Sequence, residues 1–198
     1  MDKIIKPKVS IVVPIYRKMP NAEFFIERCL SSIREQSFQD YEIVMTEDGK
    51  MAENTNSGIK KATGELIKIL YQDDMFAHKH ALKDIVENFK GHWMITGVDN
   101  NPHPHWTKDI ETGNNKLGSP SALTIKNEDP LLFDENLGWL LDVDLYKRMY
   151  DKYGAPTILD DVNVIMGIGD HQASNIMGDE VKLKEANYLK QKHESTLR

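Results

Sequence analysis

Residues 66–74 read Leu-Ile-Lys-Ile-Leu-Tyr-Gln-Asp-Asp, an apolar run that stops at two adjacent carboxylates. The run is short and rich in Leu and Ile, which indicates a buried strand. A carboxylate at the tip of such a strand can hold a hard divalent cation, and that cation can hold a phosphate. The simpler interpretation is a solvated turn in which Asp74 caps the next helix. These nine residues alone leave both interpretations open.

Two earlier predicted strands also end in polar residues. The first covers residues 9–14 and is followed by Tyr16, and the second covers residues 41–45 and is followed by Asp48. A helix between them makes a βαβ unit, in which the two strands run parallel with a right-handed crossover. The tips of neighbouring parallel strands lie along one edge of the sheet, where open α/β folds bind ligands. The coincidence of three polar tips, Asp74 included, predicts a ligand site at that edge.

The rest of the chain continues the alternation of strands and helices. We expect helices over residues 21–37, 51–63, 80–89 and from about 139 to 153, strands over 93–98, 121–126 and 158–168, and an irregular loop over 99–120. A loop of that length inside a compact domain is usually functional or mobile. The strongly charged tail over residues 179–198 is expected to form a surface helix.

Length and composition describe an ordinary globular protein. A chain of 198 residues, 40% hydrophobic and 28% charged, can form one domain with a sizeable core. The net charge of −6 argues against nucleic acid or an anionic membrane as the main partner. Residues 1–8 lack the apolar core of a signal peptide, and no apolar run approaches the ~20 residues that span a bilayer. The only cysteine, Cys29, fits a reducing compartment, so we expect a cytoplasmic protein.

Four spaced motifs between Val9 and about Arg148 resemble those of the family 2 glycosyltransferases, which have the GT-A fold. They are Val9–Tyr16; Ser37–Val44 with Glu47–Gly49; Asn56–Ile59 and Ala62–Glu65 running into Gln72–Asp74; and Phe133–Leu137 with Asp142–Leu145. Each motif is weak alone, and the resemblance rests on their order and spacing.

The resemblance implies an α/β fold of the Rossmann-like GT-A type, with a mixed, mainly parallel central sheet flanked by helices. Residues 1–198 would form a single domain. Its nucleotide-sugar-binding half would cover about 1–98, its acceptor and catalytic half about 99–178, and its charged C-terminal helix about 179–198.

The resemblance also assigns roles on the donor side. Pro14 and Tyr16 would line the base pocket, and Asp48 would accept a hydrogen bond from the base. A carboxylate suits the imide N–H of a pyrimidine, which favours a UDP-sugar as donor. Asp74 would bind Mn²⁺ or Mg²⁺, and Asp73 would contact the ribose or the donor sugar.

Two substitutions within the motifs and one alternative base leave parts of this assignment open. Gln72 replaces an Asp often found in the motif, so the division of roles between the two aspartates that follow is undecided. Asp142 falls at the position of the catalytic base in a Glu-Asp-x-Asp-Leu pattern whose Glu is replaced by Leu141. Asp144 is the alternative base, or caps the helix. A histidine completes the metal site in many GT-A enzymes.

Several other residues are weaker candidates for the site. His171 is the best-placed histidine for the metal, with Asp170 as its rival; His103 and His105 lie in a proline-rich loop that favours surface exposure. Trp106 and Trp139 could shape an acceptor pocket, although burial in the core explains Trp139 equally well. Residues 118–121 could approach the donor or form a simple turn.

The motifs together predict a metal-dependent, inverting glycosyltransferase that moves one sugar from a nucleoside-diphosphate sugar to an acceptor hydroxyl. A sugar nucleotidyltransferase is the second enzyme hypothesis, but residues 14–20 contain no glycine for the usual triphosphate loop. A non-catalytic nucleotide-sugar-binding module is the third, and the presence of Asp48, Asp74 and Asp142 together argues against it. The acceptor, a glycan or another hydroxyl-bearing molecule, and the formation of a homodimer stay open.

Overall fold

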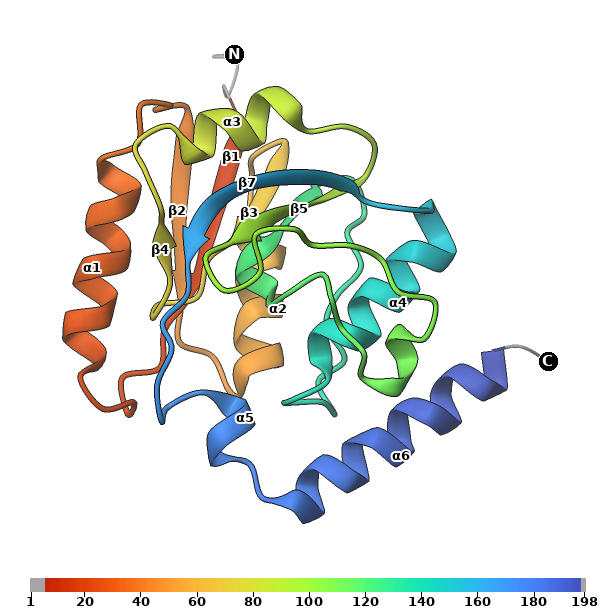
Figure 1. The fold of residues 1–198 in the computed structure, drawn as a ribbon. Helices are drawn as coiled ribbons and strands as arrows, with labels where there is room; N and C mark the ends of the chain where they lie inside the picture. The colour runs from red at the N-terminus through yellow and green to blue at the C-terminus, as the bar shows by residue number, and fades with distance from the viewer. Residues whose placement is uncertain (1–5, 197–198) are drawn as a thin grey trace.

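A computed structural model describes residues 6–196 and shows one seven-stranded sheet covered by helices (Figure 1). The strands are β1 (Val9–Pro14), β2 (Tyr41–Thr46), β3 (Leu66–Ile69), β4 (Met75–Phe76), β5 (Trp93–Val98), β6 (Leu123–Lys126) and β7 (Thr157–Ile165). The α-helices are α1 (Ala22–Arg34), α2 (Met51–Lys61), α3 (Ala81–Asn88), α4 (Leu141–Tyr153), α5 (Ala173–Ile176) and α6 (Asp179–Thr196). Two short 3₁₀ helices, η1 (Ile110–Thr112) and η2 (Pro120–Ala122), lie in the long loop after β5.

The sheet order is β2-β1-β3-β6-β5-β7-β4. Strand β1 pairs in parallel with β2 and β3, and β5 pairs in parallel with β7. Strands β6 and β4 run antiparallel to their neighbours. Five strands therefore point the same way, and the predicted α/β fold with a mixed, mainly parallel sheet is confirmed.

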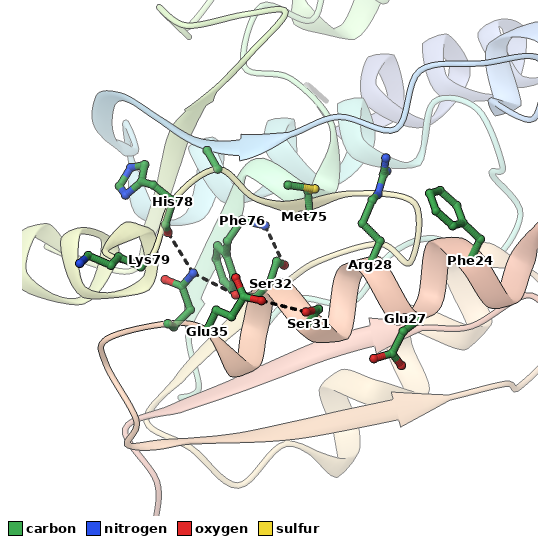
Figure 2. Close-up of a pocket in the computed structure, with 12 residues that line it drawn as sticks. Phe24, Glu27, Arg28, Ser31, Ser32, Glu35, Met75, Phe76, His78 and Lys79 are labelled. Atoms are coloured by element: carbon green, nitrogen blue, oxygen red, sulfur yellow. Dashed lines mark hydrogen bonds between the residues drawn. The ribbon is translucent and has the colours of Figure 1, made fainter.

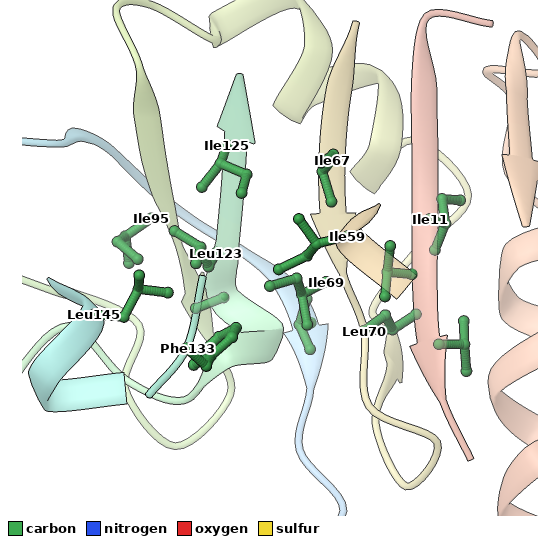
Figure 3. Close-up of a cluster of buried hydrophobic side chains, with 14 of the residues drawn as sticks. Ile11, Ile59, Ile67, Ile69, Leu70, Ile95, Leu123, Ile125, Phe133 and Leu145 are labelled. Carbon is green, nitrogen blue, oxygen red and sulfur yellow. The ribbon is translucent and has the colours of Figure 1, made fainter. Parts of the chain in front are cut away.

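The apolar strands form the centre of the protein because both of their faces are covered. Every residue of β1 and β5 is buried, as expected for parallel strands between layers of helices. Figure 3 shows Ile11, Ile67 and Ile95, from β1, β3 and β5, among the side chains of this core. Burial of this kind stabilises a fold by about 25 cal/mol for each Å² of apolar surface removed from water.

Helices α1 and α2 lie on opposite sides of strands β1 to β3 (Figure 1). In α1 the buried residues Ile26, Cys29, Leu30 and Ile33 recur at helical spacing. Helix α2 approaches β1 closely at Gly58, where a Cβ atom would lie 2.3 Å from Val12 Cγ1. The close contact brings the start of α2 beside the tips of β1 and β2.

Several element bounds differ from the sequence prediction. Helix α1 and strand β7 each end three residues early, at Arg34 and Ile165. Strand β3 ends at Ile69, two residues before the expected Tyr71, because the Tyr71 amide donates to the Ser121 hydroxyl and not to β1. Strand β4 was not predicted, since two residues carry no periodicity, yet it pairs with β7 at the edge of the sheet.

The charged C-terminal segment forms a helix as expected. Helix α6 runs across the bottom of Figure 1, beside η1 and α4. Residues 197 and 198 of the predicted helix lie outside the described residues. Among residues 6–196, the helices are too short or too polar for any of them to cross a membrane.

Candidate active site

The strand registers bring the predicted donor-side residues to one edge of the sheet. Pro14 pairs with Thr46, and Val12 pairs with Ile69. Just past the strand ends, the Ile15 amide donates to Thr46 O at 2.7 Å, and Gln72 bonds to the backbone of Tyr16, so the three tips stay side by side. The side chains of Tyr16 and Asp48 are each 58% exposed, so both are open to a ligand.

Two amide side chains hold the loops that carry these residues. Gln72 accepts a hydrogen bond from the Tyr16 amide at 2.5 Å and donates one to the Tyr16 carbonyl at 3.1 Å. Asn54 accepts from the Asp48 amide at 3.0 Å and donates to Ile15 O at 2.9 Å. Sequence reasoning treated Gln72 only as a missing carboxylate and missed Asn54. The residue types gave no signal, because these bonds cross between loops.

Asp48 has the surroundings of an ionised hydrogen-bond acceptor. Its carboxylate accepts from the Ser57 hydroxyl and lies 3.1 Å from Lys61 Nζ. These hydrogen bonds, with the charge of Lys61, lower the pKa of Asp48. The group therefore stays charged and solvent-accessible at the edge of the sheet.

The aspartates after β3 occupy different environments. Asp74 is 1% exposed, and its Oδ1 accepts a hydrogen bond of 2.7 Å from the Gly167 amide. Asp73 is partly exposed, and its Oδ2 lies 3.0 Å from His171 Nε2. Burial raises the pKa of both carboxyls, and the charge of Asp73 raises that of Asp74 further. Burial therefore disfavours the ionised form of both carboxyls, and a bound cation would favour that form.

His171 is brought to the acidic pair, and its hydrogen bonds define its tautomer. Nε2 lies 3.0 Å from Asp73 Oδ2 and also 3.0 Å from Gly167 O. A carbonyl oxygen can only accept, so we place the proton on Nε2. Asp170, the rival of His171 in the sequence, is exposed.

A close backbone approach brings the segment after β7 onto the acidic pair. A Cβ atom at Gly167 would lie 2.2 Å from the Asp73 carbonyl oxygen. Only glycine fits without movement, and this contact allows the Gly167 amide to reach Asp74.

Lys68 supplies a buried positive charge beneath the acidic pair. It is fully buried in β3, and its Nζ donates to the carbonyl of Ser121. Burial lowers the pKa of Lys68 to about 7, whereas the charge of Asp74 opposes that change. Ser121 belongs to the predicted turn over residues 118–121, which contacts the β3 tip.

Asp142 lies in the first turn of α4 and faces the same site. Asn115 Nδ2 donates to its Oδ2 at 2.9 Å, and the Val143 amide donates to its Oδ1 at 2.8 Å. Burial raises the pKa of Asp142 to about 6. Burial also raises the pKa of Tyr71, and the charges of Asp142, Asp74 and Asp73 raise it further. Tyr71, which sequence reasoning did not select, therefore lies among the three carboxylates.

Asp144, the alternative base, is fully buried in a network of positive groups. Its carboxylate lies 2.8 Å from Arg148, 2.8 Å from Lys192 Nζ and 3.2 Å from His193 Nε2. Burial opposes ionisation, but the bond to His193 and the charge of Arg148 prevail and lower the pKa of Asp144. The capping interpretation is wrong, because Leu140 is the N-cap residue of α4 and no side chain of its own caps it.

The remaining candidates lie in the long loop and beside α4. His103 and His105 are both exposed, in agreement with the surface interpretation. Trp106 stacks on Tyr150 with ring centroids 3.9 Å apart. Trp139 is partly buried, with Lys182 Nζ 5.6 Å above its ring. Both tryptophans flank α4.

The donors around Asp74 fit a divalent cation that is shared with a ligand. Within residues 6–196, no group of three or more His, Cys, Asp or Glu side chains is arranged to hold a metal. Mg²⁺ and similar ions are commonly held by one or two carboxylates together with substrate phosphates and water. The Asp73–Asp74 pair fits this mode of binding better than a closed protein site.

A groove of about 510 Å³ lies outside this site, between α1 and β4 (Figure 2). Its lining includes Phe24, Arg28, Met75 and His78. None of the donor-side carboxylates described above lines it. The groove adjoins the acidic pair, because its Arg28 donates to the Asp73 carbonyl, but the candidate catalytic carboxylates lie at the strand tips and at the start of α4.

Comparison with known proteins points in the same direction as the geometry. Residues 10–96 match the family model "Glycosyl transferase family 2". No curated protein sequence matches the chain. The matched residues include Tyr16, Asp48, Asp73 and Asp74.

Solved structures share the fold at low sequence identity. Staphylococcus aureus TarS (residues 1–349) with UDP-GlcNAc has a TM-score of 0.65 at 18% identity, over 90% of this chain and 64% of that one. With UDP, TarS has a TM-score of 0.60 at 17% identity, over 82% and 61%. Mannosyltransferase PcManGT from Pyrobaculum calidifontis, with GDP-Man and Mn²⁺, has a TM-score of 0.58 at 18% identity, over 84% and 58%. The chain thus matches less than two thirds of each of these longer proteins.

Proposed function

Because residues 10–96 match the family model "Glycosyl transferase family 2", we propose that this protein is a metal-dependent, inverting glycosyltransferase. It moves one sugar from a nucleoside-diphosphate sugar to an acceptor hydroxyl. The observation that carries the proposal is the loop over residues 115–121, which joins Asp142 to the tip of β3: Asn115 donates to Asp142 at 2.9 Å, and the Ser121 hydroxyl accepts from the Tyr71 amide at 2.9 Å. A base on one side and a cation-binding pair on the other are what a single displacement requires.

The donor binds along the tips of β1, β2 and β3. Pro14 and Tyr16 line the base pocket, and the exposed phenol ring of Tyr16 offers a face for stacking. Asp48 accepts a hydrogen bond from the base, which favours uridine, and Asp73 contacts the ribose or sugar. The similar structures hold nucleotide ligands: TarS was solved with UDP and with UDP-GlcNAc, and PcManGT with GDP-Man. These ligands support a nucleotide sugar as the donor.

Asp74 and His171 hold a divalent cation, with Mn²⁺ or Mg²⁺ as the candidates. When bound, the cation neutralises charge that builds on the leaving diphosphate. His171 must release the proton that Nε2 shares with Asp73 and Gly167 before that nitrogen can act as a ligand. Lys68 lies beneath the pair, and the charge of Asp74 favours protonation of its buried amine, whose pKa burial lowers to about 7.

Asp142 takes the proton of the acceptor hydroxyl. With a pKa near 6 it is ionised at neutral pH and more basic than an ordinary aspartate. Asn115 fixes Oδ2 by donating to it. One displacement by the activated hydroxyl inverts the anomeric centre. Asp144 is unsuited to this role because Arg148, Lys192 and His193 surround it.

The remaining parts of the proposal concern the whole chain. Residues 1–198 act as one domain, with a donor half over about 1–98, an acceptor half over about 99–178 and the charged helix beyond. The buried Cys29 fits our expectation of a cytoplasmic enzyme. The acceptor hydroxyl would enter beside Asp142, near the partly buried Trp139.

A thermal-shift and hydrolysis screen tests the function. UDP, UDP-GlcNAc and GDP-mannose are each added with and without Mn²⁺, and melting temperature and nucleoside-diphosphate release are measured. We expect a uridine ligand with Mn²⁺ to raise the melting temperature most, and slow hydrolysis of the matching sugar. Absence of both effects for every ligand would overturn the proposal.

The non-catalytic binding module is the second candidate, and one observation favours it. Asp74 is already bonded to the Gly167 amide, and His171 to Asp73, so the proposed metal donors are satisfied within the chain. The same screen separates the two functions. A module would be stabilised by the ligands without releasing nucleoside diphosphate.

A further inference from the structure

Helix α6 places a buried carboxylate at the start of the helix that carries Asp142. Glu185 Oε1 accepts from the Gly138 amide at 2.8 Å. Its Oε2 accepts from the Trp139 amide at 2.8 Å and the Leu140 amide at 2.9 Å. Glu185 is only 8% exposed. Three backbone donors next to α4 are thus satisfied by one side chain about 45 residues away.

The sequence at the start of α4 provides no cap of its own. Leu140, the N-cap residue, has no side-chain oxygen and makes no capping bond. Asp142 uses Oδ1 for the Val143 amide, and its Oδ2 faces Asn115. The first N–H groups of a helix need partners, and a carboxylate is the most favourable one because the helix N-terminus is positive. Glu185 supplies a carboxylate just before that terminus, where it accepts from the amide of the N-cap residue Leu140 and from the two amides that precede it.

Further side chains on the same face of α6 contact α4 or are buried beside it. Leu189, one turn after Glu185, is fully buried. His193 Nε2 lies 3.2 Å and Lys192 Nζ 2.8 Å from Asp144. Charged and apolar contacts together thus fix the position of α6 against α4.

We infer that Glu185 is a positioning residue for Asp142, and that α6 is the element through which it acts. This inference rests on the proposed function, since it concerns the placement of the proposed base. Residues 138–140 lead directly into the turn that holds Asp142, and their three amides are pinned by Glu185. A displacement of a catalytic group by about 1 Å can cost on the order of 10²-fold in rate.

The test compares two Glu→Gln changes on the same helix. Glu185→Gln removes the charge and leaves one acceptor oxygen for three amides, while its new NH₂ group faces N–H donors. Glu180→Gln is the matched control, because Glu180 lies on α6 with a side chain that is 82% exposed. Hydrolysis is measured with Mn²⁺ and whichever of UDP-GlcNAc and GDP-mannose the wild type turns over. Hydrogen exchange is measured at the amides of residues 138–140.

For Glu185→Gln we expect kcat to fall about 10- to 100-fold, with KM for the donor within about twofold of the wild type. Exchange at residues 138–140 should be faster, and Glu180→Gln should match the wild type in all three readouts. A kcat equal to that of the control, or a loss carried by KM alone, would overturn the inference.

A second variant covers the case in which Glu185→Gln does not melt cooperatively. Glu185→Asp keeps the charge and shortens the side chain, so it should retain part of the amide protection and a kcat between those of the wild type and the Gln variant. If Glu185→Asp keeps the wild-type kcat although the amides of residues 138–140 exchange as fast as in the Gln variant, the inference is contradicted. If the wild type hydrolyses neither donor, the proposed function fails first, which separates the two outcomes.

Discussion

Neutral amides hold the segments around Tyr16 and Asp48, whereas a charged side chain from the end of the chain, Glu185, holds the segment just before the helix that carries Asp142. Gln72 bonds both backbone groups of Tyr16, and it does so beside two aspartates without adding charge. On the other side, Glu185 holds the start of α4. The residues that we assign to the donor side are thus held by segments next to the sheet. The residues that we assign to the acceptor side depend on the docking of a separate helix, α6.

The most severe change on the acceptor side is Asp142→Asn. A general base contributes about 10²- to 10⁴-fold, and we expect donor hydrolysis and transfer to fall by that range. Donor affinity measured by calorimetry should stay unchanged, because Asp142 belongs to the acceptor side. Asp151→Asn, in the same helix with an exposed side chain, is the control and should keep full activity. Loss of donor affinity in Asp142→Asn would break the proposed division between the two sides.

The most severe change on the donor side is Gly167→Ala. The added Cβ would lie 2.2 Å from Asp73 O, so the backbone must shift away from the acidic pair. We expect a loss of about 1–3 kcal/mol in unfolding free energy and a smaller Mn²⁺-dependent rise in melting temperature. Gly178→Ala is the control, since a Cβ there meets nothing within 4 Å. Equal unfolding free energies for the two variants would show that the close approach is dispensable.

A milder donor-side change is Gln72→Glu. The carboxylate could still accept from the Tyr16 amide, but it could not donate to the Tyr16 carbonyl, and it would add charge beside Asp73. An unsatisfied group costs about 1–3 kcal/mol, so we expect roughly tenfold or weaker donor binding with a smaller change in kcat. Gln191→Glu, on the exposed surface of α6, should leave donor binding as in the wild type. A fall in kcat at unchanged donor affinity would place Gln72 on the catalytic side.

The smallest expected effect is a pH dependence that sharpens the role of Asp142. Its pKa of about 6 in the folded protein predicts that hydrolysis falls about tenfold for each pH unit below that value. Because burial raises this pKa above its unfolded value, the carboxyl binds its proton more tightly in the folded state. Its contribution to stability is therefore present at low pH and lost as pH rises through about 6.

That linkage gives a second readout through stability. The melting temperature of Asp142→Asn relative to the wild type should increase between pH 5 and pH 7.5, because only the wild type then buries a charged carboxylate. A difference that stays constant over this range would mean that Asp142 does not titrate with a raised pKa.

Residues that carry the fold could be read from the chain with little error. The buried strands, the parallel order of the first two and the polar residues at their tips follow from local patterns. β-branched and apolar runs select strands, and a short helical crossover forces neighbouring strands to run parallel. The structure joins the tips of these strands through the bonds of Gln72 to Tyr16 and of Asn54 to Asp48 and Ile15. The two-residue strand β4 and the short helices were not predicted, since they have no period to detect, and α1, β3 and β7 end two or three residues before their predicted ends.

The sequence by itself therefore determined the sheet and the edge where chemistry gathers. Only the tertiary structure decided that Gln72 holds the Tyr16 loop, that His171 meets Asp73, that Lys192 and His193 approach Asp144, and that Glu185 holds the segment before α4. These contacts join residues from 45 to 98 positions apart. A strand or helix repeats a pattern along the chain, but a single long-range hydrogen bond leaves no repeat, so it appears only once the packed elements bring its two ends together.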